Sequence, residues 1–379
     1  LMLGAAWLAA LAAFALTGRV VPAVVACGMD AFSLGLGGEA NRFYSEPAGA
    51  ATLAALSLGL LHAARRPPPR RGARGVGALA GLACRTTAIF QPLLLVLPGL
   101  LAGVWAAGGA PRRRWLRSGA LVLLGGLLVA GPWMLRNQIR FGSPAISGRQ
   151  HNLLYRAGLS ELPFSAYGDA FLYFTPDVFP LRASRRAVVE SGTVRLLDNH
   201  HPAGAYQAGH ARLMAVKREA AASGRDWDGM AREKALEQIR AHPLGYLLMS
   251  APLAWHGIFA ERGWGIEPGR TGEPLARALW GVPPLRLQLP ARNPEARVLS
   301  SLLLFGSFVA CLGTAALRRR LDLALYLLPA AYGFACYVLV SHMVTRFSVP
   351  FLPTFAVCTV VVGDALARRV APRWYSGLR

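Results

Sequence analysis

Acidic side chains are scarce in this chain of 379 residues, which has 19 Asp and Glu against 41 Lys and Arg and a formal net charge of +22. Lysine is nearly absent too, with only Lys217 and Lys234. This is typical of a genomic codon bias, so the abundance of arginine by itself indicates no function. The basic residues also lack the interleaved aromatic side chains that mark a nucleic-acid surface. We therefore expect no nucleic-acid partner.

Metal-site and nucleophile motifs are missing as well. The five cysteines lie in apolar stretches without metal-type spacing, so we interpret them as small buried hydrophobic residues. No Walker loop, HExxH motif or nucleophile elbow is present. His200, His201 and His210 could bind a metal, but no Cys or acid supports them, which favours ordinary loop histidines. The sequence predicts no metal site and no cofactor, and it leaves the use of a divalent cation open.

One glycine pattern invites two interpretations. Residues 75–80, with the sequence Gly-Val-Gly-Ala-Leu-Ala, formally fit a dinucleotide-binding motif. No strand is expected before them, however, and no acid follows at the distance that such a motif requires. The small residues instead favour close packing between two helices through Gly77 and Gly81.

What the chain does contain is long apolar segments. Hydrophobic residues make up 54% of the sequence and the mean hydropathy is +0.37. The excess occurs in blocks of about 20 residues, the length that an α-helix needs to cross a bilayer. These blocks predict an all-α polytopic membrane protein.

Arginine-rich runs at residues 65–74, 112–117, 318–320 and 368–379 fix the orientation. An even number of apolar segments separates each run from the next, and short basic loops stay on the cytoplasmic face. Anionic lipid headgroups are the expected partners of these runs. The expected crossings are residues 2–16, 20–36, 47–64, 75–84, 87–107, 118–135, 299–317, 323–340 and 347–366.

This topology divides the chain into three parts. Residues 1–136 and 299–379 are membrane helices, and residues 137–298 form an extracytoplasmic, largely helical cap that holds 14 of the 19 acids. Residues 244–259 are apolar but short and contain Pro252, so we expect an interfacial helix there. The chain opens at Leu1 inside an apolar run without a basic segment before it, so we expect an N-terminal truncation.

A candidate site lies where polar residues meet the outer ends of the helices. Three of the five acids outside the cap, Asp30, Glu39 and Glu46, fall there, and ionisable groups near the membrane usually have a task. The sequence Ser45-Glu46-Pro47 is equally well explained as a helix start, with an acid on the positive end of the helix dipole.

Four arginines are expected at the outer face, although most arginines of this chain lie in the cytoplasmic turns. Any one of them could be an arginine that extends its head to the lipid headgroups. Together with acids and amides at the same depth, they favour a joint site for a lipid-anchored phosphate, because the planar guanidinium matches phosphate oxygens. The outer-face candidates are Arg42, Arg85, Arg136, Arg346, Glu39, Glu46, Asn137 and His342.

Several short motifs resemble one family. Residues 131–137, Gly-Pro-Trp-Met-Leu-Arg-Asn, continuing through Phe141-Gly142 to Asn152-Leu153, resemble a segment of bacterial family 39 glycosyltransferases. These are relatives of the protein O-mannosyltransferases and of the aminoarabinose transferase of lipid A. Residues 45–47, 81–86, 235–243 and 346–353 agree in the same order. The resemblance extends over nearly the whole chain.

The resemblance implies a GT-C fold, a membrane helix bundle that takes sugar from a polyprenyl-phosphate donor at its outer face in the bacterial inner membrane. It implies catalytic roles for Glu46 and Glu39 and donor-phosphate contacts for Arg85, Arg136 and Arg346, supported by Asn137 and His342. In such enzymes the catalytic base lies in the first outer loop, which we expect upstream of Leu1.

The expected mechanism is inverting sugar transfer, in which arginines neutralise the leaving phosphate and a carboxylate deprotonates an acceptor hydroxyl. The acceptor could be a glycan, a lipid or a protein. A transporter or flippase of a lipid-linked glycan would also need outer arginines, although we find no internal repeat of the transporter type. A catalytically incomplete fragment is the third interpretation.

Overall fold

The computed structural model describes residues 1–33, 46–65, 69–145, 151–198, 201–259, 294–341 and 345–370. Within these ranges the chain is helical throughout its ordered elements and has no β-sheet, which confirms the predicted all-α fold. The chain divides into two compact units. The membrane unit comprises Leu1–Ile146, Ala260–Gly333 and Ser348–Arg379, and the loop unit comprises Ser147–Phe259 and Phe334–Phe347.

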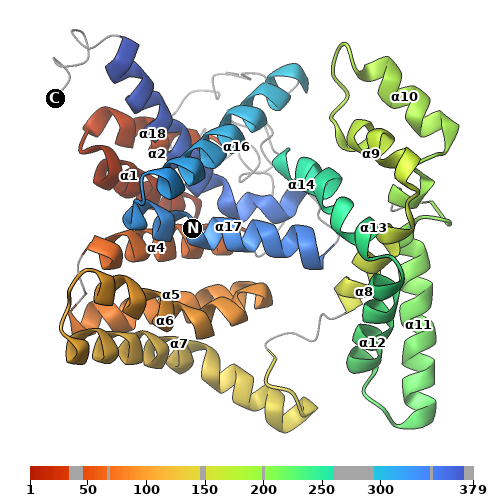
Figure 1. The fold of residues 1–379 in the computed structure, drawn as a ribbon, viewed down its shortest axis with the longest axis horizontal. Helices are drawn as coiled ribbons and strands as arrows, with labels where there is room; N and C mark the ends of the chain where they lie inside the picture. The colour runs from red at the N-terminus through yellow and green to blue at the C-terminus, as the bar shows by residue number, and fades with distance from the viewer. Residues whose placement is uncertain are drawn as a thin grey trace, which may run out of the picture. The chain divides into compact units, whose positions relative to one another are not determined.

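The membrane unit holds the apolar helices (Figure 1). Six described segments are long and apolar enough to cross a membrane, and α1 and α2 are shorter apolar helices. This supports the prediction of a multi-pass membrane protein. The helices are α1 (Met2–Thr17), α2 (Val20–Ala31), α4 (Glu46–Arg65), α5 (Arg70–Thr86), α6 (Gln91–Ala107), α7 (Arg112–Phe141), α16 (Pro294–Leu317), α17 (Leu321–Val340) and α18 (Leu352–Val370).

The basic ends of several helices meet through ion pairs. Asp322 and Asp364, the two acids that lie outside both the cap and the outer cluster, each form ion pairs with two arginines from different parts of the chain. The pairs are Asp322 with Arg65 at 3.4 Å and Arg320 at 2.9 Å, and Asp364 with Arg368 at 2.6 Å and Arg19 at 4.0 Å. The turns that the charge pattern assigns to one face therefore lie together at one end of the membrane unit.

The end of α6 belongs to the same group. Trp105 Nε1 donates a hydrogen bond of 2.7 Å to the carbonyl of Ala63, two residues before the end of α4 at Arg65. The basic run at residues 112–117 follows Trp105 within a few residues. This basic run therefore lies at the same end of the membrane unit as the ion pairs of Asp322.

Glycines bring α5 and α7 into backbone contact. A Cβ on Gly77 would lie 1.9 Å from the carbonyl oxygen of Val122, and one on Gly81 would lie 2.5 Å from that of Gly126. Small residues allow this approach, and the helices of a membrane bundle gain dispersion energy from it. The predicted packing role of Gly77 and Gly81 is confirmed.

Helix α7 is longer than the expected crossing at both ends. It continues past Leu135 to Phe141 because no helix breaker follows, and it ends where Gly142 takes a left-handed conformation with φ 69°. The N–H of Gly142 then donates to the carbonyl of Gln138 at 3.0 Å. Arg136 and Asn137 thus lie on a rigid helix, not in a loop.

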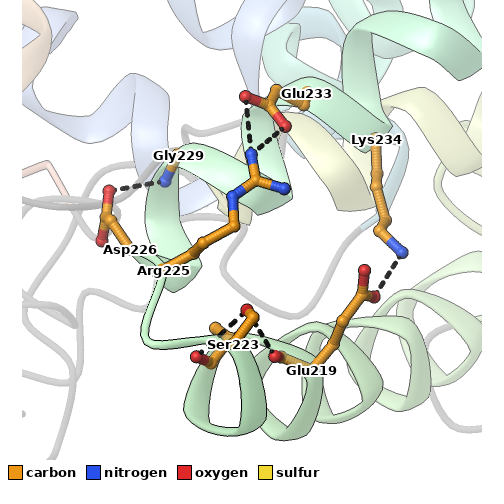
Figure 2. A network of polar contacts seen from close by, with 8 residues as sticks. Glu219, Ser223, Arg225, Asp226, Gly229, Glu233 and Lys234 are labelled. Atoms are coloured by element: carbon orange, nitrogen blue, oxygen red, sulfur yellow. Dashed lines mark hydrogen bonds and ion pairs between the residues drawn. The ribbon is translucent and has the colours of Figure 1, made fainter.

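The loop unit is built from shorter helices. Its main hairpin, α11 with α12, packs on α8 through a core that includes Leu154, Leu213, Val216 and Met230. Polar contacts fix the turn of this hairpin, as Figure 2 shows for the Asp226 cap of α12. The helices are α8 (His151–Gly158), α9 (Tyr167–Phe174), α10 (Arg182–Ser191), α11 (Ala205–Ser223), α12 (Trp227–Ala241), α13 (Pro243–Leu248) and α14 (Ser250–Ile258).

The expected single interfacial helix over residues 244–259 is two short helices, α13 and α14. Pro252 has no N–H to donate to the carbonyl of Leu248, so the helix is interrupted at that point. Neither piece is long enough to cross a bilayer.

Gly77→Ala should lower the free energy of unfolding by roughly 1–3 kcal/mol, because the added methyl group overpacks a backbone contact. Gly75→Ala is the matched control, since its Cβ would meet nothing within 4 Å. Thermal unfolding of both purified variants in one detergent measures the difference. Equal melting temperatures would contradict this account of the helix contact.

Reporter fusions after Arg71 and after Gly224 should report opposite sides of the membrane. Arg71 lies in the first turn of α5, and three expected crossings, α5, α6 and α7, separate it from Gly224. Of these, α6 and α7 are long and apolar enough to span a membrane, so the result tests whether the shorter α5 crosses as well. The same side for both fusions would overturn the topology.

Candidate functional site

Two arginines share one tryptophan at the end of α5 and α7. The guanidinium carbon of Arg85 lies 5.6 Å from the centre of the Trp133 ring, and that of Arg136 lies 4.7 Å from it. Arg85 is in the last turn of α5, while Trp133 and Arg136 are one turn apart on α7. The glycine contact between the helices brings these side chains within reach of the same indole.

Asn137 supports this group from the next position of α7. Its side-chain oxygen accepts a hydrogen bond of 3.3 Å from Arg136, and its amide nitrogen donates one of 2.7 Å to the carbonyl of Ala145. Asn137 is buried, whereas Arg85 and Arg136 are exposed. The amide therefore links the chain that leaves α7 to the arginine that faces outward.

The two arginines on Trp133 have no carboxylate partner among the described residues. Among the residues that the structure describes, neither Arg85 nor Arg136 forms an ion pair with a carboxylate, in contrast to Arg65 and Arg320 at the other end. A tryptophan face attracts a guanidinium but does not neutralise its charge. Two cations held on one ring form a site that favours an anion.

The structure tests only part of the predicted site. Glu46 begins α4, where its half-buried carboxylate lies in the first turn, as both predicted interpretations require. Glu39, Arg42 and His342 lie outside the described residues, and so does the side chain of Arg346. Within the membrane unit, α4 lies beside the segment before α18, because a Cβ on Gly49 would lie 3.5 Å from Pro350 Cγ.

Trp133 is the member of the site that sequence reasoning missed. It is part of the family-like motif at residues 131–137, but a lone tryptophan near a membrane surface is common and indicates no site. Its spacing of three residues before Arg136 is the only signal in the sequence, since that spacing places both side chains on one helix face.

A second charged residue that the sequence did not reveal is Arg156 of α8, whose side chain is completely buried in the loop unit. Its guanidinium donates to the carbonyls of Val338 and Tyr246 and to the hydroxyl of Ser250, at 3.1, 2.5 and 2.9 Å. It also lies 4.2 Å from the Tyr246 ring centre. Burial lowers the pKa of Arg156 to about 10, so the group stays charged at neutral pH.

Val338 lies on the last turns of α17, so Arg156 joins three elements of the loop unit to the end of a membrane helix. No carboxylate is among its hydrogen-bond partners. The positive charge is stabilised by carbonyl dipoles and by the aromatic ring, which is the pattern of a structural anchor.

Comparison with protein-family models, with curated proteins and with solved structures found no match to this chain. The described residues hold no group of three or more His, Cys, Asp or Glu side chains that could bind a metal. The arginine pair on Trp133 and the motif around it are therefore the features from which a function is inferred.

Arg156→Met should lower the free energy of unfolding by at least about 1–3 kcal/mol, the cost of leaving buried carbonyl groups without a donor. Arg186→Met on the exposed face of α10 removes the same charge and should have little effect. Chemical unfolding of both variants, followed by tryptophan fluorescence, provides the comparison. Equal stabilities of the two would show that Arg156 is not an anchor.

Proposed function

We propose that this protein is a membrane glycosyltransferase that takes sugar from a polyprenyl-phosphate donor and transfers it to an extracytoplasmic acceptor. The observation that supports it is the pair of guanidinium groups on Trp133, which no described carboxylate opposes. The pair lies at the end of α7 away from the basic turns, 24 residues or roughly 36 Å from Arg112.

The chemistry of the pair suits a phosphate held at the membrane surface. Guanidinium groups donate two parallel hydrogen bonds to phosphate oxygens, and they keep their charge at any physiological pH. A polyprenyl phosphate anchors its phosphate at the depth where membrane helices end. Arg85 and Arg136 come from two helices, so they can contact different oxygens of one phosphate.

The same contacts would assist the reaction. When the bond between the sugar carbon and the phosphate oxygen breaks, negative charge develops on the leaving phosphate, and positioned cations stabilise it. The acceptor oxygen forms the new bond to the sugar carbon, and its proton passes to a carboxylate. Glu46, in the first turn of α4, is a described carboxylate with a catalytic role in this proposal, beside the base that the family resemblance implies in another outer loop.

The sequence resemblance supports the same function independently. The motif that resembles family 39 glycosyltransferases, residues 131–137, contains Trp133, Arg136 and Asn137. Three of the four residues that the structure gathers at this end of α7 thus come from the motif that carries the resemblance.

Arg136→Ala should weaken binding of undecaprenyl phosphate about ten- to a hundredfold, because a hydrogen bond to a charged group contributes typically ~1.5–3 kcal/mol. Arg140→Ala is the matched control, since this arginine lies one turn further along α7 and is exposed. Native mass spectrometry of the protein in nanodiscs can measure both. Undecaprenol, which lacks the phosphate, should bind wild type and Arg136→Ala equally weakly.

Transfer distinguishes an enzyme from a carrier of the same lipid. Membranes that contain the full-length protein should release polyprenyl phosphate from its sugar conjugate, and Glu46→Gln should slow release without weakening binding. Loss of undecaprenyl phosphate binding in Arg140→Ala but not in Arg136→Ala would contradict the site. Movement of the intact conjugate across the bilayer without release would indicate a flippase instead.

A further inference from the structure

Two adjoining cavities lie in the loop unit, and nothing in the proposed mechanism uses them. The polar cavity, of about 460 Å³, lies among α8, α11 and α12, and the apolar cavity, of about 340 Å³, lies beside α13. Ala241 and His242 line both, so the two cavities adjoin at these residues. They differ in the chemistry of their linings.

A planar polar triad lines the polar cavity. Arg212 donates to Glu161 at 3.0 Å and to the side-chain oxygen of Gln238 at 2.8 Å, and Gln238 donates to the same oxygen of Glu161 at 2.5 Å. Ala215 and Ala241, both exposed, add apolar surface to the same lining. Apolar surface beside hydrogen-bonding groups matches a ring that has carbon–hydrogen faces and hydroxyl edges.

The cations of this cavity are already paired. Arg212 is bound to Glu161, and Lys234 donates to Glu219 at 2.7 Å, as Figure 2 shows. Glu237 adds a further carboxylate to the lining. A phosphate or carboxylate ligand would therefore meet no unpaired cation here and would approach a negative charge, whereas neutral hydroxyl groups would meet both donors and acceptors.

The apolar cavity has walls of hydrocarbon. Leu162, Phe164, Leu244 and Leu248 line it, and the hydroxyl group of its one tyrosine, Tyr167, is used by the carbonyl of Gly245 at 2.8 Å. At its rim Phe164 is 75% exposed and Leu244 is 66% exposed. Such exposed hydrophobic side chains mark a surface that binds a lipid or another apolar group.

The rim belongs to a helix that is fixed to a membrane-spanning segment. The hydroxyl of Tyr246, two residues after Leu244, donates to the carbonyl of Leu339 near the end of α17. Arg156 binds the neighbouring carbonyl of Val338 and the carbonyl of Tyr246. The apolar cavity is thereby placed close to the depth at which α17 leaves the bilayer, where acyl chains are within reach.

We propose that the two cavities bind one amphiphilic ligand, a membrane lipid with a neutral, polyhydroxylated headgroup. The headgroup lies on the triad of Glu161, Arg212 and Gln238, and an acyl chain lies along Phe164 and Leu244.

Native mass spectrometry of the full chain in phosphatidylcholine nanodiscs tests the proposal. The probes are a glucosyl diacylglycerol and a phosphatidylglycerol with the same acyl chains. Wild type should retain the glucosyl lipid preferentially, and Gln238→Ala should reduce that retention about three- to tenfold, because neutral hydrogen bonds are lost. Glu233→Gln is the matched control, since Glu233 lies on α12, pairs with Arg225 and lines neither cavity.

Leu244→Ser tests the apolar half and should also reduce retention of the glucosyl lipid. If Gln238→Ala melts below wild type, Arg212→Gln tests the same triad. The proposal would be overturned if wild type retained the two lipids equally. It would also be overturned if triad variants that melt like wild type retained as much glucosyl lipid as wild type does.

Binding of undecaprenyl phosphate, measured on the same samples, separates this site from the proposed function. Arg136→Ala should lose the polyprenyl phosphate and keep the glucosyl lipid. A wild type that retains the glucosyl lipid but not the polyprenyl phosphate would refute the glycosyltransferase, while the lipid site would stand.

Discussion

The backbone contact between α5 and α7 is the constraint on which the candidate site depends. Gly77 and Gly81 allow the two helices to approach until only a hydrogen atom fits between their backbones. At that separation Arg85, in the last turn of α5, reaches the Trp133 ring of α7. With larger residues at the glycine positions the helices would move apart, and the two arginines would no longer share one indole.

The two ends of the membrane unit treat positive charge differently. At one end Asp322 and Asp364 each form ion pairs with two arginines, which hold the helix ends together and reduce repulsion among the basic loops. At the other end Arg85 and Arg136 have an aromatic ring and an amide as their described partners. The two guanidinium groups held on one indole are the physical basis for expecting an anionic ligand there.

The loop unit shows how a charge can be buried without an acid. Arg156 uses carbonyl groups of α13 and α17 and the face of Tyr246, so the buried guanidinium costs less than it would in hydrocarbon. The same contacts hold α13 against the last turns of α17. The rim of the apolar cavity is consequently fixed by a completely buried arginine.

The sequence by itself determined the helical class, the apolar segments and the grouping of the basic turns, because hydropathy and the charge of short loops are local properties. It also identified Gly77 and Gly81 as packing residues, and Arg85, Arg136 and Asn137 as candidates. It did not reveal Trp133 or Arg156, since their roles depend on partners such as Arg85 and Val338 that lie far away in the chain. Only the tertiary structure decided which arginines meet, which are neutralised by Asp322 and Asp364, and that Pro252 divides the expected interfacial helix in two, because these outcomes depend on distances between elements that no local pattern encodes.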